Sequence, residues 1–402
     1  MTGSIAGPLT GVRVLDVGTR IAAPFCAGLL GEMGAEVIKV EDPKGGDFMR
    51  TIGPFGGADG KYSLYWSVEG RGRKSVTLDL RSAEGQDLFR RLAATSDIVC
   101  ENFRPGTLER WNIGPADLDP KLVIVRISVF GQDGPYAQRG GLDRMGIGYG
   151  GLMHLTGYPD RPPVRPGVTV SDYLTGTFAA GAAVAALYKR DAGGSGRGAV
   201  IDACLTGSVM RILEWTLAGY DAMGIVRERE GNRLVNSAPL DNYPTGDGKY
   251  ICIVAGSDAN FRKLCRAMKR EELADDPRFK TLQMRAAAGD ELNDLVTAWT
   301  MSHTAAEIET LCVADDVPVA NVYSAADIFA DPHVAARGDL VTVDDPVLGP
   351  VRQQAPVPRF DGEPAPAPSG APRLGEHNAE VWGGLLGMSD NELADLSARG
   401  VV

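Results

Sequence analysis

The chain has 402 residues, of which 44% are apolar and 23% charged, so it is long enough for two hydrophobic cores and too apolar for a disordered protein. Its net charge of −11 argues against a surface for nucleic acid or anionic membranes, because such surfaces need a local excess of Lys and Arg. Six cysteines without a CxxC pair argue against a disulfide framework or a zinc site and favour reduced thiols.

The N-terminus and the longest apolar stretch both indicate a soluble chain. Residues 1–9 lack the basic and apolar regions of a secretory signal. The small-apolar stretch 177–188 is too short to span a bilayer and is expected to form a buried helix. We therefore predict a cytoplasmic protein that binds neither membrane nor nucleic acid.

The first part of the chain alternates β-type and helical segments. Strands are expected over 12–17, 36–40, 75–80, 98–100 and 122–128, and helices over 22–34 and 82–95. This alternation predicts a parallel sheet flanked by helices.

The composition changes after residue 226. A turn at Asp247-Gly248 precedes an expected strand over 249–254, and the chain up to residue 323 is mostly helical, with a capping box at Thr304 and Glu307. We expect residues 227–323 to form a smaller α+β domain.

The rest of the chain is expected to return to the large domain, which then comprises residues 1–226 and 324–402. Residues 355–372 are dense in Pro and Ala and should form an extended linker. Two short helices are expected after it, over 378–386 and 390–398.

Several kinds of chemistry lack the motifs they need. Residues 146–151 match G-x-G-x-x-G, but they follow a polar turn far from the first strand, whereas a dinucleotide fingerprint joins a strand to a helix. No G-x-S-x-G elbow occurs, and the histidines are too far apart for a metal motif: His154, His303, His333 and His377. We expect no metal and no tightly bound cofactor. Backbone amides of glycine-rich segments such as Gly146 to Gly151 are one available source of donors for a developing oxyanion.

Asp172 lies where a turn meets the Ala-rich helix, and two roles are open for it. The first is a helix cap. The second is a nucleophile, because a helix N-terminus is expected to keep the carboxyl ionised at neutral pH, and an ionised carboxylate attacks an acyl group.

Basic residues gather in the first part of this acidic chain, at Arg71, Arg73, Lys74, Arg104, Arg110 and Arg139. They are either solvated loop charges or a site for an anion with several phosphates, since they follow expected strands or lie in the next loops.

The chain resembles the family III CoA-transferases, which include formyl-CoA transferase and carnitine CoA-transferase, over essentially its full length. The segments that carry the resemblance include GVRVLDVGTRIAAPFCAGLLGEMGAEVIKVE, SDIVCENFRPGTLERW, GLMHLTG, SDYLTG and LGEHNAEV. The resemblance implies a Rossmann-like doubly wound α/β domain with a smaller α+β domain, in an interlocked homodimer. It also implies that CoA moves from an acyl-CoA to a free carboxylic acid through an aspartyl-CoA thioester on Asp172.

The same resemblance implies which residues contact CoA, the substrate and product. Ile21 and Ala22 should approach its pantetheine or adenosine, and Arg73 and Lys74 its nucleotide end. The adenine and phosphates should meet Asn102, Phe103, Arg104 and Arg110, with Arg139 in a later phosphate-binding loop.

Two departures bear on the substrate. Residues 232–241 read NRLVNSAPLD where formyl-CoA transferase carries a glycine-rich loop, and Lys44 stands near the place of an arginine beside CoA. His154 and Arg165 are close to Asp172 in sequence, and they either bind the second carboxylate of a dicarboxylic acid or are ordinary surface residues.

Two alternative functions remain open. The α-methylacyl-CoA racemases resemble this chain, but they need a histidine in a G-H-D motif where this sequence reads Gly141-Leu142-Asp143, and leucine exchanges no proton. The other alternative is a non-catalytic CoA-binding protein.

Overall fold

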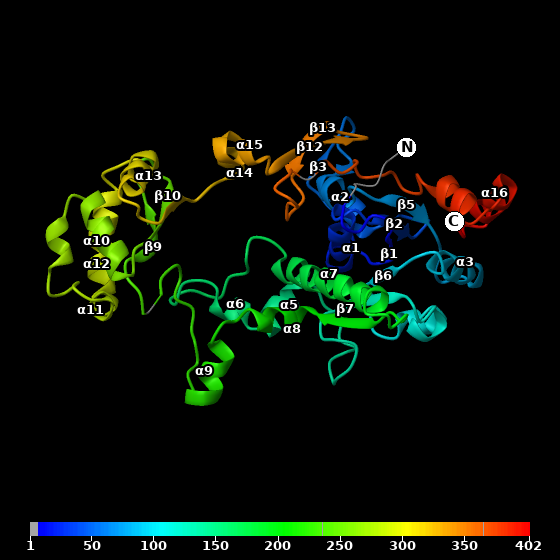
Figure 1. Ribbon diagram of the computed structural model, residues 1–402, viewed down its shortest axis with the longest axis horizontal. Coiled ribbons are helices and arrows are strands. Elements are labelled where there is room, and N and C mark those ends of the chain that lie inside the picture. The colour runs from blue at the N-terminus through cyan, green and yellow to red at the C-terminus, as the bar shows by residue number, and fades with distance from the viewer. Residues whose placement is uncertain (1–6, 235, 365) are drawn as a thin grey trace. The chain divides into compact units, whose positions relative to one another are not determined.

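The computed structural model describes residues 7–234, 236–364 and 366–402, and the chain divides into two compact units (Figure 1). The first unit contains the chain up to Met153, Arg165–Asp221 and His333–Val402. The second contains His154–Val164 and Ala222–Pro332.

The first unit is built on a six-stranded parallel sheet. Its strands, in spatial order, are β5 (Lys74–Thr77), β2 (Glu36–Glu41), β1 (Arg13–Asp16), β6 (Ile98–Glu101), β7 (Val123–Ser128) and β8 (Val200–Cys204). Numbered along the chain, this order is 3-2-1-4-5-6, that of the doubly wound α/β folds. The predicted α/β fold with a parallel sheet is therefore confirmed, although the sequence pattern missed β8. The order reverses between β1 and β6, and such sheets bind ligands at the carboxyl ends of the strands at this point.

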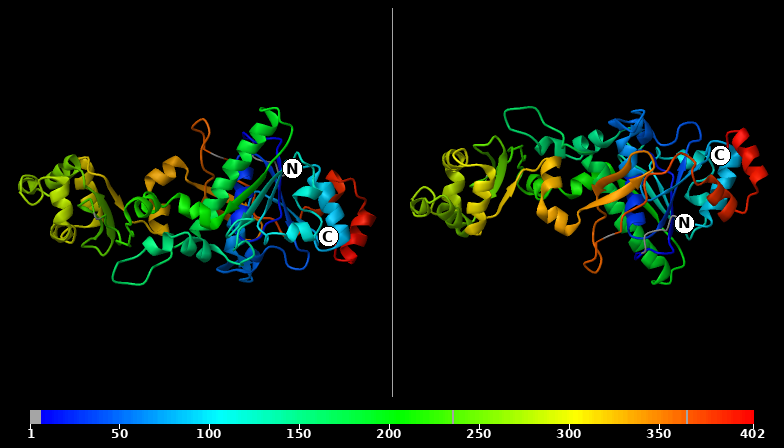
Figure 2. Two further views of the ribbon diagram at one scale, coloured as in Figure 1. Left: turned by 90° about the horizontal axis from the view of Figure 1, so that it is seen from below. Right: turned by 90° about the horizontal axis from the view of Figure 1, so that it is seen from above.

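Both faces of the sheet are covered, because successive residues of a strand point to opposite faces. In β1, Leu15 belongs to the core that contains α3 (Ala83–Ala93), the π-helix η4 (Ala379–Leu385) and α16 (Asp390–Ala398). Its neighbour Val14 belongs to the core that contains α1 (Ala22–Glu32) and α7 (Val170–Asp191). Both views of Figure 2 show the two C-terminal helices beside α3.

Helix α7 is the one helix in the described part of the chain with the length and hydropathy of a membrane span. Its residues Ala179, Ala180 and Ala183 are almost fully buried in the core with α1. Gly176 permits this packing, because a Cβ there would lie 2.8 Å from the carbonyl oxygen of Ala22. Helix α7 is thus a core helix of the first unit.

Shorter elements complete the first unit or lie at its borders. They are η1 (Phe48–Thr51), β3 (Phe55–Gly56), β4 (Tyr62–Ser63), α2 (Leu64–Glu69), α4 (Thr107–Arg110), η2 (Pro115–Asp117), α5 (Asp143–Tyr149), α6 (Leu152–Leu155), α8 (Leu205–Arg211), α9 (Thr216–Met223), α15 (Pro332–Arg337), β12 (Leu340–Asp345) and β13 (Gly349–Gln354). Between β13 and η4 the described residues form no helix or strand. This segment returns to the first unit, since the carbonyl oxygen of Pro372 accepts hydrogen bonds from Arg50 and Trp66.

The second unit has a three-stranded antiparallel sheet of β11 (Val319–Asn321), β10 (Tyr250–Val254) and β9 (Leu240–Pro244). Its helices are α10 (Asp258–Ala267), η3 (Glu271–Ala274), α11 (Leu282–Ala287), α12 (Gly289–Thr300), α13 (Ala305–Ala314) and α14 (Ala325–Ala330). The predicted capping box is confirmed, since Thr304 and Glu307 cap α13 reciprocally.

Candidate active site

A buried ionic network lies at the carboxyl ends of β1 and β2. The Lys39 Nζ atom is 3.3 Å from Asp16 Oδ2 and 2.9 Å from Asp47 Oδ2, and all three side chains are almost fully buried. Burial by itself lowers the pKa of Lys39, but the two carboxylates raise it above its usual value. Asp47 also accepts hydrogen bonds from the backbone N–H groups of Arg20 and Met49, so the network fixes the loops after β1 and β2.

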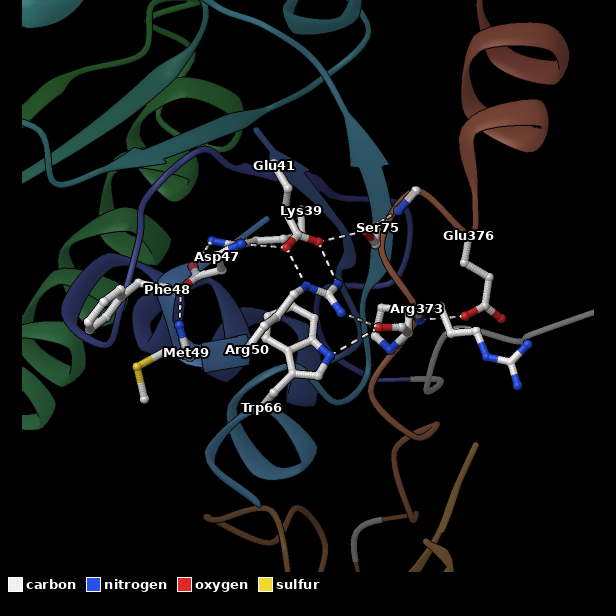
Figure 3. Close-up of polar contacts among 12 residues, drawn as sticks. Lys39, Glu41, Asp47, Phe48, Met49, Arg50, Trp66, Ser75, Arg373 and Glu376 are labelled. Carbon is white, nitrogen blue, oxygen red and sulfur yellow. Dashed lines mark hydrogen bonds and ion pairs between the residues drawn. The ribbon is translucent and has the colours of Figure 1, made fainter. Parts of the chain in front are cut away.

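A second ionic contact braces the same loops (Figure 3). The Glu41 carboxylate accepts hydrogen bonds from Arg50 Nε at 2.7 Å and from Ser75 Oγ at 2.6 Å. The Arg50 guanidinium lies 3.7 Å from the centre of the Trp66 ring. Figure 3 also shows Arg373, whose backbone N–H donates to Glu376.

A cavity of about 410 Å³ opens beside these loops, at the edge where the strand order reverses. Thr19, which lines the cavity, exchanges two hydrogen bonds of 2.8 and 2.7 Å with Asn102. Aromatic, apolar, basic and acidic side chains line it, among them Arg20, Glu41, Asp42, Asp47, Phe48, Leu78, Leu80, Arg81, Phe103 and Trp111. Aromatic rings with cations suit a nucleotide, whose base stacks and whose phosphates need positive charge.

A larger cavity of about 600 Å³ lies at the opposite edge of the sheet. Its lining includes Arg13 and Lys74, which begin β1 and β5 and already pair with Glu36. Open parallel sheets bind ligands at the carboxyl edge, so the smaller cavity is the better candidate despite its volume.

Asp172 is the third residue of α7 and is partly buried. Thr169 holds the N-cap position without a side-chain hydrogen bond. Among the described residues, the Asp172 carboxylate accepts no hydrogen bond and forms no ion pair. The structure therefore does not use Asp172 as a helix cap.

The pKa of Asp172 is raised to about 7, chiefly by burial. The carboxylates of Asp143 and Glu69 raise it further, and Arg20 lowers it. The expectation that the helix N-terminus keeps this carboxyl fully ionised at neutral pH is wrong, because burial and two neighbouring carboxylates outweigh the favourable charges.

The neighbours of Asp172 on α7 are firmly held. Ser171 is buried and donates two hydrogen bonds to Asp143. Tyr173 donates to Glu69 Oε1 at 2.8 Å, and its ring centre lies 4.7 Å from that of Phe25 on α1. The first turn of α7 is thus fixed while the carboxylate between these residues stays unpaired.

Arg20 is a site residue that sequence reasoning missed. It lines the smaller cavity, and its guanidinium carbon lies 3.8 Å from the centre of the Phe48 ring. Its backbone is in the left-handed region, with φ of 67°. The available signal was an arginine just after the first strand, where the loop of a doubly wound fold meets its ligand.

Several predicted CoA contacts lie near the smaller cavity. Ile21 is the N-cap of α1 and Ala22 its first residue, and both are buried. Asn102 is hydrogen-bonded to Thr19, which lines the cavity, and Phe103 lines it directly. Arg104, Arg110 and Arg139 are exposed and pair with no carboxylate among the described residues. Arg104 lies against Gly140, next to Arg139, because a Cβ on Gly140 would be 2.5 Å from its Nη2 atom.

The structure does not bring Arg73 and Lys74 to this cavity. Arg73 is 5% exposed and donates to Asp16 Oδ2 and to the carbonyl oxygen of Pro24, both at 2.6 Å. Lys74 pairs with Glu36 and, at 2.7 Å, with Glu380. Both residues line the larger cavity at the other edge.

The tentative substrate residues lie in different units. His154 belongs to the second unit, where its Nε2 atom is 3.1 Å from Glu228. Arg165 belongs to the first unit, where it is exposed and donates to the carbonyl oxygen of Pro166.

The expectation that Gly146 to Gly151 form an oxyanion site is wrong, because most of the segment is helix α5. The backbone N–H groups of Gly146, Gly150 and Gly151 already donate to the carbonyl oxygens of Leu142, Gly146 and Gly148. Leu142 precedes α5 with 52% of its surface exposed and offers no acid or base beside Asp143. Among the described residues, no group of three or more His, Cys, Asp or Glu side chains is arranged to hold a metal ion.

Comparisons with known proteins agree with this architecture. Residues 9–378 match the family model described as CoA-transferase family III. The chain is 44% identical over 401 residues to succinyl-CoA–D-citramalate CoA-transferase of Chloroflexus aurantiacus, covering 98% of each chain. It is 32% identical over 399 residues to succinyl-CoA:glutarate CoA-transferase of Homo sapiens, covering 98% of this chain and 90% of that one. A solved CAIB/BAIF family protein from Brucella suis superposes with a TM-score of 0.83 at 36% identity, covering 94% of this chain and 99% of the other.

Proposed function

The chain belongs to CoA-transferase family III and moves CoA between an acyl-CoA and a carboxylic acid, and on this premise we propose that Asp172 is its nucleophile and that its acids are dicarboxylic. The observation that carries the assignment is the Asp172 carboxylate, which is held on a fixed helical turn without a hydrogen bond or ion pair among the described residues. A carboxylate that is partly desolvated and unpaired is available to attack an acyl group.

The reaction is a sequence of acyl transfers in which the CoA thiolate is used again, the donor acid is released and Asp172 is regenerated. An oxygen of ionised Asp172 attacks the thioester carbonyl carbon of the donor, the C–S bond breaks, and a mixed anhydride and CoA thiolate result. The thiolate then attacks the aspartyl carbonyl carbon, which releases the donor acid and leaves aspartyl-CoA. The acceptor carboxylate then attacks the aspartyl-CoA thioester, which releases CoA thiolate and gives a second mixed anhydride. The thiolate attacks the acceptor's carbonyl carbon in that anhydride, which forms the new CoA thioester and frees the Asp172 carboxylate.

The pKa of Asp172 suits this role. A value of about 7 leaves a substantial ionised fraction at neutral pH, while the burial that raises it removes the water that would compete for the aspartyl thioester. No proton acceptor is needed, because the nucleophile is the carboxylate itself.

We propose that CoA binds in the cavity of about 410 Å³, with its phosphates toward the exposed guanidiniums of Arg104, Arg110 and Arg139. The aromatic lining from Phe103 and Trp111 supports this placement, and so does the fact that no described carboxylate pairs with the three arginines. We propose that Arg73 acts as a structural residue under α1 instead of a CoA contact, since its terminal nitrogens are already hydrogen-bonded.

The proposed substrate class rests on relatives whose names pair succinyl-CoA with citramalate, malate or glutarate. All four acids carry two carboxylates. We propose that this chain likewise exchanges CoA between succinyl-CoA and a second dicarboxylic acid.

We further propose a cytoplasmic homodimer. Helix α7 exposes the aromatic side chains Phe178, at 44%, and Tyr188, at 71%, which are available for contact with a second chain.

The proposal is tested by incubating the protein with succinyl-CoA in the absence of an acceptor acid. We expect an aspartyl-CoA thioester that hydroxylamine converts into a hydroxamate and that a peptide map places on Asp172. Asp172→Asn serves as the control, because it keeps the size of the side chain and is expected to form no adduct. Labelling of a different residue, or transferase activity retained by Asp172→Asn, would contradict the proposed mechanism.

A further inference from the structure

We propose that Arg20 binds the distal carboxylate of the dicarboxylic substrate and thereby selects dicarboxylic over monocarboxylic acids. The inference rests on the proposed function and assigns to a named residue the recognition of the second carboxylate. Neither His154 nor Arg165 is needed for it.

The first observation is that Arg20 is a partly buried cation without an anion. Among the described residues its guanidinium forms no ion pair and no hydrogen bond, although most arginines of similar burial in the first unit are paired. Arg71 pairs with Glu32 at 2.7 Å and Arg50 with Glu41 at 2.7 Å, for example. A partly desolvated guanidinium therefore has donors available for a ligand.

The second observation concerns position. Arg20 lines the proposed CoA cavity, and its charge acts on Asp172. Arg20 also directly precedes the N-cap of α1, which packs on α7 where Ala22 meets Gly176 and Phe25 meets Tyr173. The loop that lines the cavity is thus joined to the helix pair that carries Asp172, where the acyl group of the thioester must bind. In a four-carbon diacid, three C–C bonds separate the two carboxyl carbons. A cation close to the nucleophile is therefore within reach of the distal carboxylate.

The third observation is that the loop is built to hold this arginine. The backbone N–H of Arg20 donates to buried Asp47, and its guanidinium carbon lies over the ring of Phe48, 3.8 Å from the ring centre. The left-handed backbone at Arg20, with φ of 67°, is unfavourable for a residue with a Cβ and is retained here at a ligand-binding edge. A guanidinium fixed in this way presents two parallel N–H donors, the arrangement that a carboxylate accepts.

The test uses two reactions in which the free acid and the acyl group of the CoA ester are the same compound. The two acids differ only in the distal carboxylate. Isotope-labelled succinate is exchanged into succinyl-CoA, and labelled butyrate into butyryl-CoA, at about pH 8.5, above the pKa of Asp172. For Arg20→Met we expect kcat/KM for succinate exchange to fall by about 100-fold, since a charged hydrogen-bonding pair is lost. Butyrate exchange is expected to stay within about threefold of the wild type or to rise, because the apolar end no longer faces an unpaired cation.

Two further variants sharpen the result. Arg20→Lys keeps the charge without the two-donor geometry and is expected to recover part of the succinate exchange. Arg81→Met removes another cation that lines the cavity, and it is expected to leave the ratio of succinate to butyrate exchange unchanged. Met, Lys and Arg meet the same backbone strain at position 20, so the comparison is not confounded by φ.

An equal loss of both exchanges in Arg20→Met, or an unchanged ratio, would overturn the assignment. A wild-type protein that exchanges butyrate as well as succinate would overturn it too. A failure of the proposed function is recognised separately, by trapping the adduct of Arg20→Met with butyryl-CoA. This adduct forms on Asp172 if Asp172 is the nucleophile, whether or not Arg20 selects the acid.

Discussion

The carboxylate of Asp143 accepts two hydrogen bonds from Ser171, one from the backbone N–H and one from Oγ, each with a length of 2.8 Å. Both residues are almost fully buried. The contact fixes the first turn of α7, and it places a negative charge where it opposes ionisation of Asp172.

Asp143→Asn is expected to move the pH dependence of the first chemical step to lower pH. The asparagine oxygen still accepts from Ser171, but the charge that raises the pKa of Asp172 is gone. Since the ionised form of Asp172 reacts, the rate should persist further into acid. The measurement is the single-turnover rate of adduct formation from succinyl-CoA between about pH 5 and 9. Asp87→Asn, at an exposed position on α3, should leave the profile in place, and a shift of Asp143→Asn toward higher pH would contradict the prediction.

Asp172→Asn is expected to abolish transfer and to stabilise the protein. The pKa of Asp172 rises from 3.8 to about 7 on folding, so ionisation destabilises the folded state from about pH 4 upward, with the full effect above pH 7. The neutral amide avoids this penalty, and we expect a gain of about 1 to 3 kcal/mol in the free energy of unfolding at pH 8. Denaturant unfolding at pH 8 and pH 4 checks it, because the gain should nearly vanish at the lower pH. A variant less stable than the wild type at pH 8 would show that the carboxylate has a structural partner after all.

Gly176→Ala is expected to lower stability by about 1 to 3 kcal/mol and to slow transfer. The added methyl group would lie 2.8 Å from the carbonyl oxygen of Ala22 and 3.0 Å from the Phe25 ring, so α7 and α1 must separate. Gly181→Ala is the matched control on the same helix, because nothing lies within 4 Å of its Cβ position. That variant should gain up to about 1 kcal/mol from helix propensity. Thermal unfolding of both variants checks the prediction, which fails if they change stability in the same direction.

Arg104→Ala is expected to weaken binding of the CoA ester by about 1 to 3 kcal/mol, because a hydrogen bond between a guanidinium and a phosphate is lost. The guanidinium is exposed and has no carboxylate partner among the described residues, so its removal should hardly affect folding. Titration calorimetry with CoA and with a CoA lacking the 3′-phosphate measures the effect and identifies the phosphate concerned. Arg90→Ala on α3, which bonds to the carbonyl oxygen of Asn112, is the surface control. Equal affinity of Arg104→Ala and the wild type would remove Arg104 from the site.

The sequence predicted the parallel sheet because its central strands are short apolar runs separated by helical segments, as at β1, α1 and β2. Strand β8 was missed because Val200–Cys204 includes a polar residue and follows a glycine-rich turn, and its pairing with β7 lies far along the chain. The local sequence pattern does not show which distant strand a segment pairs with.

Side-chain roles were harder to predict than the elements that carry them. The sequence indicates that Arg73 and Lys74 form one exposed basic pair. Neighbouring residues at a strand point to opposite sides, however. Arg73 is therefore buried against Asp16, while Lys74 pairs with Glu380 nearer the surface. Arg20 was missed because its relation to Asp172 arises from the packing of the first loop beside α7. The raised pKa of Asp172 likewise depends on Asp143 and Glu69, which come from α5 and α2.

The buried network of Asp16, Lys39, Asp47 and Arg73 contains two carboxylates and two cations, so its formal charges cancel and it offers no net attraction to a polyanion. On the proposed placement of CoA, the attraction for this polyanion comes from the exposed guanidiniums of Arg104, Arg110 and Arg139. Mobile ions screen exposed charges over about 8 to 10 Å at physiological ionic strength, whereas they do not reach a buried carboxylate. Capture of the CoA ester should consequently weaken as salt is added, while the covalent chemistry that follows proceeds at an unchanged rate.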